Sequence, residues 1–295
     1  MSTTAATIEP QTRTLHVPGA TLTYDIRTNE QTAEPPLVLI GLPMGAAGFG
    51  TLAGHFTDRT VVTYDPRGTE RSERKPDAPP STPDIHADDL HRLISAIGGP
   101  VDLFASSGGA VVALALVARY PEDVRTLVAH EPPVAALLPD REAALAAVKD
   151  CNDTYQRSGW GPAMAKFIAI VSHRGPIPAD WTDQPAPDPQ TFGLPTEDDG
   201  SRDDPMFGQN MAATTHYGPD FEALRQAPTH IVIAAGKESE GEMAYRGAFA
   251  VAERLGTTPV IFPSGHGGFL GGEYGQMGEP EPFAAKLWDV LDGEI

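Results

Sequence analysis

The chain has 295 residues, of which 40% are hydrophobic and 21% charged, a composition typical of a globular protein with one large domain or one domain with an insertion. Its 40 acidic against 21 basic residues give a formal net charge of -19, which repels nucleic acids and anionic membrane surfaces and excludes them as expected partners. The single cysteine, Cys151, excludes an intrachain disulfide and metal sites built from several cysteines.

The beginning of the chain, residues 1–9, contains neither the basic segment nor the apolar segment of a secretory signal. No apolar run reaches the ~18 residues that a membrane-spanning helix needs. We therefore expect a cytoplasmic protein whose partner is a small-molecule substrate, without membrane contact. The oligomeric state has no signature in the sequence.

Through the first 130 residues, short runs of β-branched and apolar residues alternate with longer stretches of helical periodicity. Such alternation is typical of an α/β protein with a mostly parallel sheet covered by helices on both faces, here entered through an antiparallel hairpin. The predicted helices cover 84–97 and 108–119. The predicted strands cover 14–17, 22–27, 37–41, 61–65, 101–106 and 124–130.

The pattern changes after residue 133, because no convincing strand follows before residue 229. Helical stretches are predicted near 140–157 and 162–173. Residues 175–205 are so rich in Pro, Asp and Gly that we expect an irregular surface loop or the edge of a lid. Strands resume at 229–236 and 259–263, each followed by a helix. A helical segment therefore interrupts an eight-stranded sheet between its sixth and seventh strands.

An insertion at the carboxyl ends of parallel strands lies over the crevice in which such sheets bind ligands. We therefore expect residues 1–132 and 229–295 to form the core domain and residues 133–228 to form a helical cap. The larger apolar side chains of this cap either pack it onto the core or line a substrate pocket. They are Trp160, Phe167, Ile168, Trp181, Phe192, Phe207 and Met211.

The most informative stretch runs from Val101 to Ala110, where an apolar strand stops at a serine and continues as a helix. At a nucleophile elbow, a serine in a sharp strand-to-helix turn exposes its hydroxyl, and the turn admits only small residues two positions before and after it. Here these positions hold Ala105 and Gly109, and the alanine is a mild departure from the usual G-x-S-x-G pattern. Ser107 is therefore the candidate nucleophile.

Three further motifs accompany the elbow: GLP at 41–43, DPRGTERS at 65–72 and GHG at 265–267. With these motifs, the chain resembles the α/β-hydrolase superfamily and, among its members, the capped bacterial serine hydrolases. The resemblance covers nearly the whole chain. It implies a catalytic triad in the order serine, acid, histidine, with the histidine after the last strand.

The resemblance assigns the general base to His266, which follows the final predicted strand in a loop of small residues. Such a base takes the proton of the serine hydroxyl and returns it to the leaving group. The acid departs from the family pattern, because Ser239 occupies its usual slot after the next-to-last strand. Glu131, at the end of the strand after the nucleophile helix, is the first candidate, and Glu238 is the alternative if its loop is re-routed.

An oxyanion hole needs two backbone N–H donors. The resemblance places one at Gly108, which follows the nucleophile, and one at Leu42, in the loop after the third strand. The family's His-Gly-x-Pro motif lacks its histidine here, but a backbone donor does not depend on that side chain. We expect Arg67 and the other charged residues of 65–72 to fix their turn. Surface or packing roles are expected for His130, Asn210 and His216.

A serine nucleophile with a histidine, an acid and an oxyanion hole supports acyl transfer through a covalent acyl-enzyme, with water as the second acceptor. The predicted function is hydrolysis of an ester, lactone or thioester. No cofactor and no metal are expected, because the sequence has no H-E-x-x-H, Walker A or strand-linked G-x-G-x-x-G motif.

Two alternatives to ester hydrolysis stay open at this point. The first is perhydrolase, haloperoxidase or carbon–carbon bond hydrolase chemistry without a cofactor, because the same triad supports it. The second is a protein that binds a small ligand without turnover, which only the absent aspartate at position 239 favours.

Overall fold

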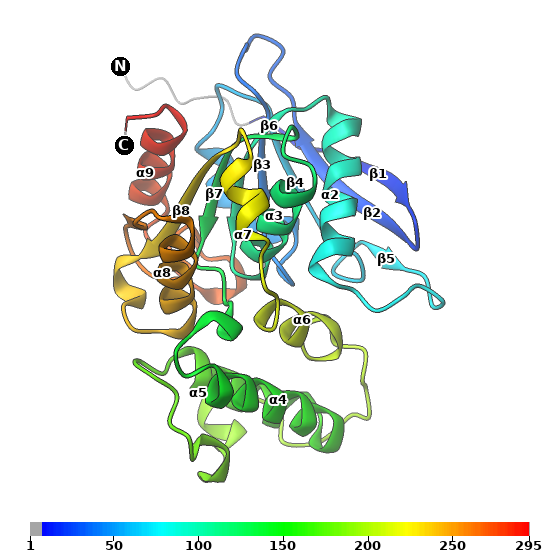
Figure 1. The fold of residues 1–295 in the computed structure, drawn as a ribbon. Helices are drawn as coiled ribbons and strands as arrows, with labels where there is room; N and C mark the ends of the chain where they lie inside the picture. The colour runs from blue at the N-terminus through cyan, green and yellow to red at the C-terminus, as the bar shows by residue number, and fades with distance from the viewer. Residues whose placement is uncertain (1–7, 295) are drawn as a thin grey trace.

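The computed structural model describes residues 8–294, so most of the stretch 1–9, on which the expectation about a secretory signal rests, lies outside it. A mixed sheet forms the centre of the molecule (Figure 1), with the strand order β1-β2-β4-β3-β6-β7-β8-β9 and β5 paired to β2. The strands are β1 Gln11–Val17, β2 Ala20–Arg27, β3 Leu37–Ile40, β4 Val61–Tyr64, β5 Glu73–Arg74, β6 Val101–Ser106, β7 Val124–His130, β8 His230–Gly236 and β9 Val260–Phe262.

The sheet is antiparallel only where β2 pairs with β1, β4 and β5, and the pairs from β4 to β9 are parallel. All residues of β3, β4 and β6 are buried, as expected for parallel strands covered on both faces. The predicted α/β architecture is confirmed. The two-residue strand β5 was not predicted, so the helical segment follows the seventh strand in chain order rather than the sixth.

Helices cover both faces of the sheet. On one face, α2, α3 and α8 contribute side chains such as Leu90, Val111 and Val251 to one apolar cluster. On the other face, α1 and α9 contribute Leu52 and Leu287 to a second. The helices are α1 Gly50–Gly54, α2 Pro83–Ile97, α3 Gly108–Arg119, α4 Arg141–Ser158, α5 Trp160–Val171, α6 Met211–Thr215, α7 Phe221–Gln226, α8 Met243–Leu255 and α9 Pro280–Leu291.

The ends of α2 illustrate why these residues form a helix there. The Thr82 side chain accepts a hydrogen bond from the N–H of Ile85, and Pro83 follows in the first turn, where its missing N–H costs nothing. The helix ends at Ile97, and the next residue, Gly98, caps it with a φ of 89°, a conformation that favours glycine. Helix α3 needs fewer such signals, because its residues from Gly108 to Val117 are all buried between the sheet and neighbouring helices, α2 above all.

The segment between β7 and β8, which is described throughout, forms helices and contains no strand. Figure 1 shows α4, α5 and α6 beyond the end of the sheet, whereas α7 lies on the sheet beside α3. The apolar side chains of the segment, among them Val148, Cys151, Tyr155 and Phe207, form a cluster that Met243 of α8 joins. The domain boundaries at residues 133 and 228 stay predictions.

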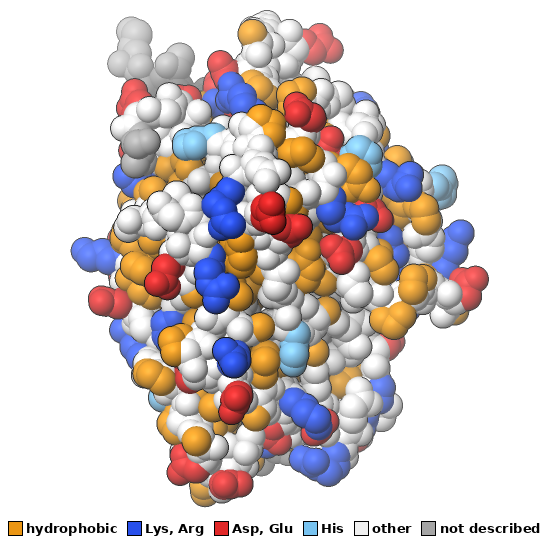
Figure 2. Space-filling view, in the orientation of Figure 1, with side chains coloured by type: hydrophobic (Ala, Val, Ile, Leu, Met, Phe, Trp, Pro, Cys, Tyr) orange, Lys and Arg blue, Asp and Glu red, His pale blue; other side chains and the backbone are white. Residues whose placement is uncertain are grey.

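The surface in Figure 2 carries acidic and basic side chains interspersed with one another, without a continuous patch of either sign on this face. Within residues 8–294, none of the helices combines the length and apolar character needed to cross a membrane. The cytoplasmic location stays a prediction.

Candidate active site

Ser107 lies at the turn that joins β6 to α3, and its backbone has φ 57° and ψ -129°. A positive φ is uncommon for a residue with a side chain and marks stored backbone strain, of order 1–3 kcal/mol. Two hydrogen bonds of 2.9 Å hold the turn: the N–H of Ser107 donates to the carbonyl of His130, and its carbonyl accepts from the N–H of Ala110. The turn leaves the Ser107 side chain only partly buried, at the wall of a cavity.

Small residues around the turn have a steric reason. A Cβ added to Gly109 would lie 2.9 Å from both the Cα of Gly41 and the carbonyl oxygen of Ile40. Ala105, two positions before the serine, is fully buried and keeps its place in β6, in register with Ile40 and Ala129. The departure from the G-x-S-x-G pattern therefore leaves the turn intact.

Glu131 and His266 meet at the end of β7. The Nδ1–H of His266 donates to Oε2 of Glu131 over 2.5 Å, and the N–H of Gly236 donates to the other carboxylate oxygen over 2.8 Å. Glu131 has φ 49° and is fully buried. Burial alone raises the pKa of Glu131, but the hydrogen bond from His266, the nearby histidines and the Gly236 N–H outweigh it and lower the pKa to about 2.

The same contact acts on His266 in the opposite direction. Burial lowers the pKa of the imidazole, and the hydrogen bond to Glu131 together with the charges of Glu131 and Glu242 raises it above its ordinary value. The hydrogen bond and the two carboxylate charges together outweigh the effect of burial on the pKa of His266. The protonated ring is thus stabilised.

The other candidate acid, Glu238, has a different partner. Its carboxylate accepts a hydrogen bond from the Ser264 hydroxyl over 3.4 Å. Ser239, in the slot where the family carries its acid, is buried, and its hydroxyl has no partner among residues 8–294. Of the two carboxylates considered from the sequence, only Glu131 contacts His266 in the described part of the chain.

Leu42 and Gly108 lie side by side. A Cβ added to Gly108 would be 2.7 Å from the carbonyl oxygen of Leu42, and both residues line the cavity at Ser107. Within the described ranges, neither backbone N–H donates to a protein acceptor. Two free donors beside a serine hydroxyl are the arrangement that an oxyanion hole requires.

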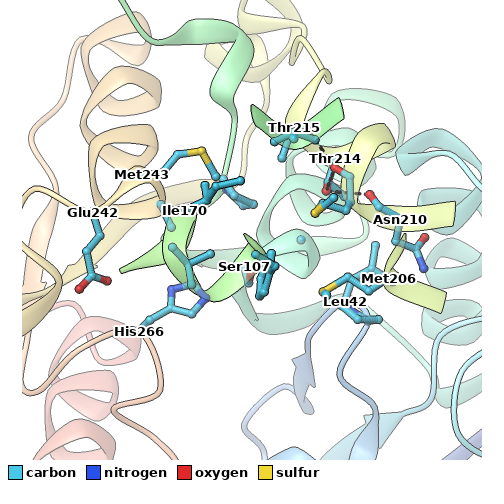
Figure 3. A pocket seen from close by; sticks show the side chains of 18 of the residues that line it. Leu42, Ser107, Ile170, Met206, Asn210, Thr214, Thr215, Glu242, Met243 and His266 are labelled. Atoms are coloured by element: carbon cyan, nitrogen blue, oxygen red, sulfur yellow. Dashed lines mark hydrogen bonds between the residues drawn. The ribbon is translucent and has the colours of Figure 1, made fainter. Parts of the chain in front are cut away.

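The cavity encloses about 330 Å³, and Ser107 and His266 share its wall (Figure 3). Among the apolar side chains predicted as pocket candidates, Phe167 and Met211 line it. Sequence reasoning missed Glu242, since its position carries no motif. Further lining residues are Pro43, Pro133, Val148, Ile170, Val171, Ser172, Met206, Asn210, Thr214, Thr215, Met243, Ala244 and Gln276.

His130 is fully buried behind the acid, and its Nε2 has no partner within residues 8–294. Burial lowers its pKa to about 4, so the ring is neutral at pH 7. His130, Glu131 and His266 each offer a ligand atom within 4.8 Å of the others, the spacing of a metal site. A metal ion would have to displace the 2.5 Å hydrogen bond between Glu131 and His266.

Three other predicted residues have contacts of their own. Arg67 pairs with the buried Asp89 of α2 over 2.6 Å. We expected it to pair with another charged residue of 65–72, but the structure ties the loop to helix α2 instead. Asn210 lines the cavity, and its side-chain oxygen lies 3.0 Å from Nε2 of the buried His86. His216 is exposed at the end of α6.

Comparison with known proteins supports the same fold and a hydrolase. A sequence model described as the alpha/beta hydrolase family matches residues 37–285. The chain is 31% identical over 291 residues to the uncharacterized hydrolase YraK of Bacillus subtilis, covering 95% of this chain and 96% of that protein.

Two solved structures show the similarity of fold. One is a thermophilic esterase from Thermogutta terrifontis, with a TM-score of 0.64, 19% identity and coverage of 97% of this chain and 98% of that one. The other is the enol-lactonase from Burkholderia xenovorans, with a TM-score of 0.64, 16% identity and coverage of 95% and 100%.

Proposed function

The chain belongs to the alpha/beta hydrolase family, and we propose that it is a serine hydrolase that cleaves an ester, lactone or thioester of a small substrate through an acyl-enzyme. The observation that carries this proposal is the 2.5 Å hydrogen bond between His266 and Glu131 at the cavity that Ser107 lines. The esterase and the enol-lactonase of similar fold favour ester and lactone bonds among the reactions of the family.

Acylation begins when the Ser107 oxygen attacks the substrate carbonyl while Nε2 of His266 takes the hydroxyl proton. Glu131, ionised at neutral pH because its pKa is about 2, keeps the other proton on Nδ1, so that Nε2 is the acceptor. The Leu42 and Gly108 N–H groups bind the negative oxygen of the tetrahedral intermediate. His266 then donates its proton to the leaving oxygen or sulfur.

Deacylation repeats these roles with water. His266 takes a proton from the water as its oxygen attacks the acyl carbonyl, and the same two N–H groups bind the second tetrahedral intermediate. The proton then returns to the Ser107 oxygen as the acid product leaves. Residues 133–228 act as a cap in this scheme, because Phe167, Met206 and Met211 supply apolar walls that exclude bulk water.

The experiment that tests the proposal is intact-mass analysis after exposure to a fluorophosphonate, which phosphonylates an activated serine. We expect one adduct on the wild type, none on Ser107→Ala, and one on the matched control Ser106→Ala, which changes the neighbouring buried serine. The wild type without an adduct, but folded, would favour a binding protein without turnover.

A substrate panel then separates the reactions that share a triad. Methyl esters, lactones, thioesters, a peracid assay with hydrogen peroxide and a carbon–carbon cleavage substrate are compared by kcat/KM. We expect the highest values among the esters and lactones. A higher value for peracid formation or carbon–carbon cleavage would reject ester hydrolysis as the main reaction.

A further inference from the structure

The cavity at Ser107 contains one charged side chain apart from the His266 ring. Among its described lining residues there is no lysine or arginine, and the only carboxylate is that of Glu242, which directly precedes α8. Figure 3 shows Glu242 beside His266, on the wall formed by the start of α8. The other walls are mostly apolar, so an electric field from this carboxylate is weakly screened inside the cavity.

The counter-ion of Glu242 lies on the solvent side. Arg174 approaches it at 3.5 Å, but the Arg174 side chain is 61% exposed and that of Glu242 only 23%. The same guanidinium also donates to the carbonyl of Glu238 over 2.7 Å. An exposed ion pair of this kind contributes little, and Arg174 therefore neutralises the cavity only in part.

A second negative charge reinforces the first. Glu131, which contacts His266, is ionised. The pKa of Glu242 is raised, first by burial and then by the charge of Glu131. A negative potential raises the pKa of a carboxyl group in this way. The formal net charge of -19 has the same sign. The cavity thus combines apolar walls with a negative potential.

We propose that Glu242 makes this cavity a charge filter, which admits substrates whose acyl group is neutral or positively charged and rejects acyl groups that end in a carboxylate. The proposal rests on the proposed function, since it names the substrate class of the same site. An acyl carboxylate would lose its hydration among apolar side chains and would be repelled by Glu242. A terminal ammonium would lose hydration too, but it would be attracted.

Three methyl esters with the same chain length test the filter. Methyl hexanoate is neutral, monomethyl adipate ends in a carboxylate, and methyl 6-aminohexanoate ends in an ammonium group. Hydrolysis is measured as kcat/KM for the wild type, Glu242→Gln and the matched control Glu240→Gln, which removes an exposed charge two residues away. Binding of the same esters is measured by calorimetry in the Ser107→Ala background, where turnover is not needed.

The wild type should prefer methyl hexanoate to monomethyl adipate by about 100-fold. In Glu242→Gln, kcat/KM should rise about tenfold for the anionic ester and fall about tenfold for the cationic one, as expected for the loss of one partly screened charge. Each charged ester is compared with the neutral ester of the same variant, because Glu242 also raises the pKa of His266 and its loss affects all three esters together. Glu240→Gln should change no ratio more than twofold. Arg174→Gln should have the opposite effect to Glu242→Gln, since it removes the counter-ion.

Equal shifts for all three esters in Glu242→Gln would leave these ratios unchanged and would overturn the proposal. A wild type that accepts the anionic ester as well as the neutral one would do the same, as would equal effects of the two glutamate substitutions. If no ester is hydrolysed but the binding preferences shift in opposite directions, the esterase proposal fails and the charge filter stands.

Discussion

Replacing Glu131 by glutamine removes one charge from the site and keeps the size of the side chain. The carboxylate accepts two hydrogen bonds, one from Gly236 and one from His266, whereas an amide has one acceptor oxygen. If that oxygen faces His266, the buried Gly236 N–H loses its partner. If the amide nitrogen faces His266, it donates to Nδ1 and leaves the proton on Nε2, which then cannot accept the proton of Ser107.

Each orientation of the amide lowers stability or activity by an amount whose order is known. An unpaired buried N–H costs about 1–3 kcal/mol of stability. In either orientation, the partner of His266 is a neutral amide instead of a carboxylate. When the amide nitrogen faces His266, the imidazole is also in the wrong tautomer, a defect that lowers kcat by about 10⁴ in serine hydrolases. We therefore expect kcat/KM to fall by about 10²–10⁴, equivalent to about 3–5.5 kcal/mol, and the free energy of unfolding to fall by about 1–3 kcal/mol.

The assay is kcat/KM for an ester substrate from pH 5 to 9, with urea unfolding from pH 2 to 7 as the measure of stability. Wild-type kcat/KM should rise with pH through an inflection above 6.5, because Glu131 and Glu242 raise the pKa of His266. In Glu131→Gln this inflection should move to lower pH. The stability difference should be largest between about pH 4.5 and 6.5, where Glu131 is ionised and His266 protonated. It should shrink toward pH 2 as Glu131 takes up a proton, and it should shrink again above pH 6.5 as His266 loses its proton.

The control is Glu238→Gln, which removes the carboxylate that faces Ser264 and should leave kcat/KM within about twofold. Wild-type activity in Glu131→Gln would refute the role of this acid. Loss of activity in Glu238→Gln alone would transfer the role to Glu238, through a rearranged loop.

Three further predictions concern the elbow and the buried histidines. Ser107→Gly should abolish turnover. It should also raise the free energy of unfolding in urea by about 1 kcal/mol, because a φ of 57° is strained for serine and unstrained for glycine. A lower free energy of unfolding would contradict the strain. Gly109→Ala should lower stability by about 1–3 kcal/mol and lower kcat/KM, because its Cβ would lie 2.9 Å from Gly41, and an unchanged melting temperature would contradict this contact. Stability should also fall as the pH drops from 6.5 to about 4, because burial lowers the pKa of His86 and of His130 to about 4 while the unfolded chain binds protons there. His86→Gln should flatten that slope in urea titrations, and an equally steep slope would exclude His86 as its source.

Local signals along the chain were sufficient for much of the architecture. The ends of α2 follow from Thr82 and Gly98, and the buried strands β3, β4 and β6 follow from short apolar runs. The two-residue strand β5 escaped prediction because Glu73 and Arg74 have no apolar pattern and pair with β2 only through the backbone.

The candidate site was predictable where a motif or a strand end marks it. Ser107 follows from the small residues of the elbow, and the resemblance of short motifs to those of the family implies Leu42, Gly108 and His266. For the acid, the sequence left Glu131 and Glu238 as alternatives, and the structure places only Glu131 against His266. The catalytic roles of these residues stay predictions until the substitutions are measured.

By itself, the sequence indicated the family, most strands, the longer helices and the residues at the elbow, because motifs, apolar runs and turn residues are patterns among neighbours along the chain. It gave no sign of the short elements β5, α1, α6 and α7. Tertiary structure alone decided which carboxylate reaches His266 and which side chains enclose the cavity. Glu131 and His266 are 135 positions apart, and Glu242, Met206 and Phe167 come from different elements of the chain. Their meeting depends on how β7, β8 and the helical segment pack, and no local pattern records that packing.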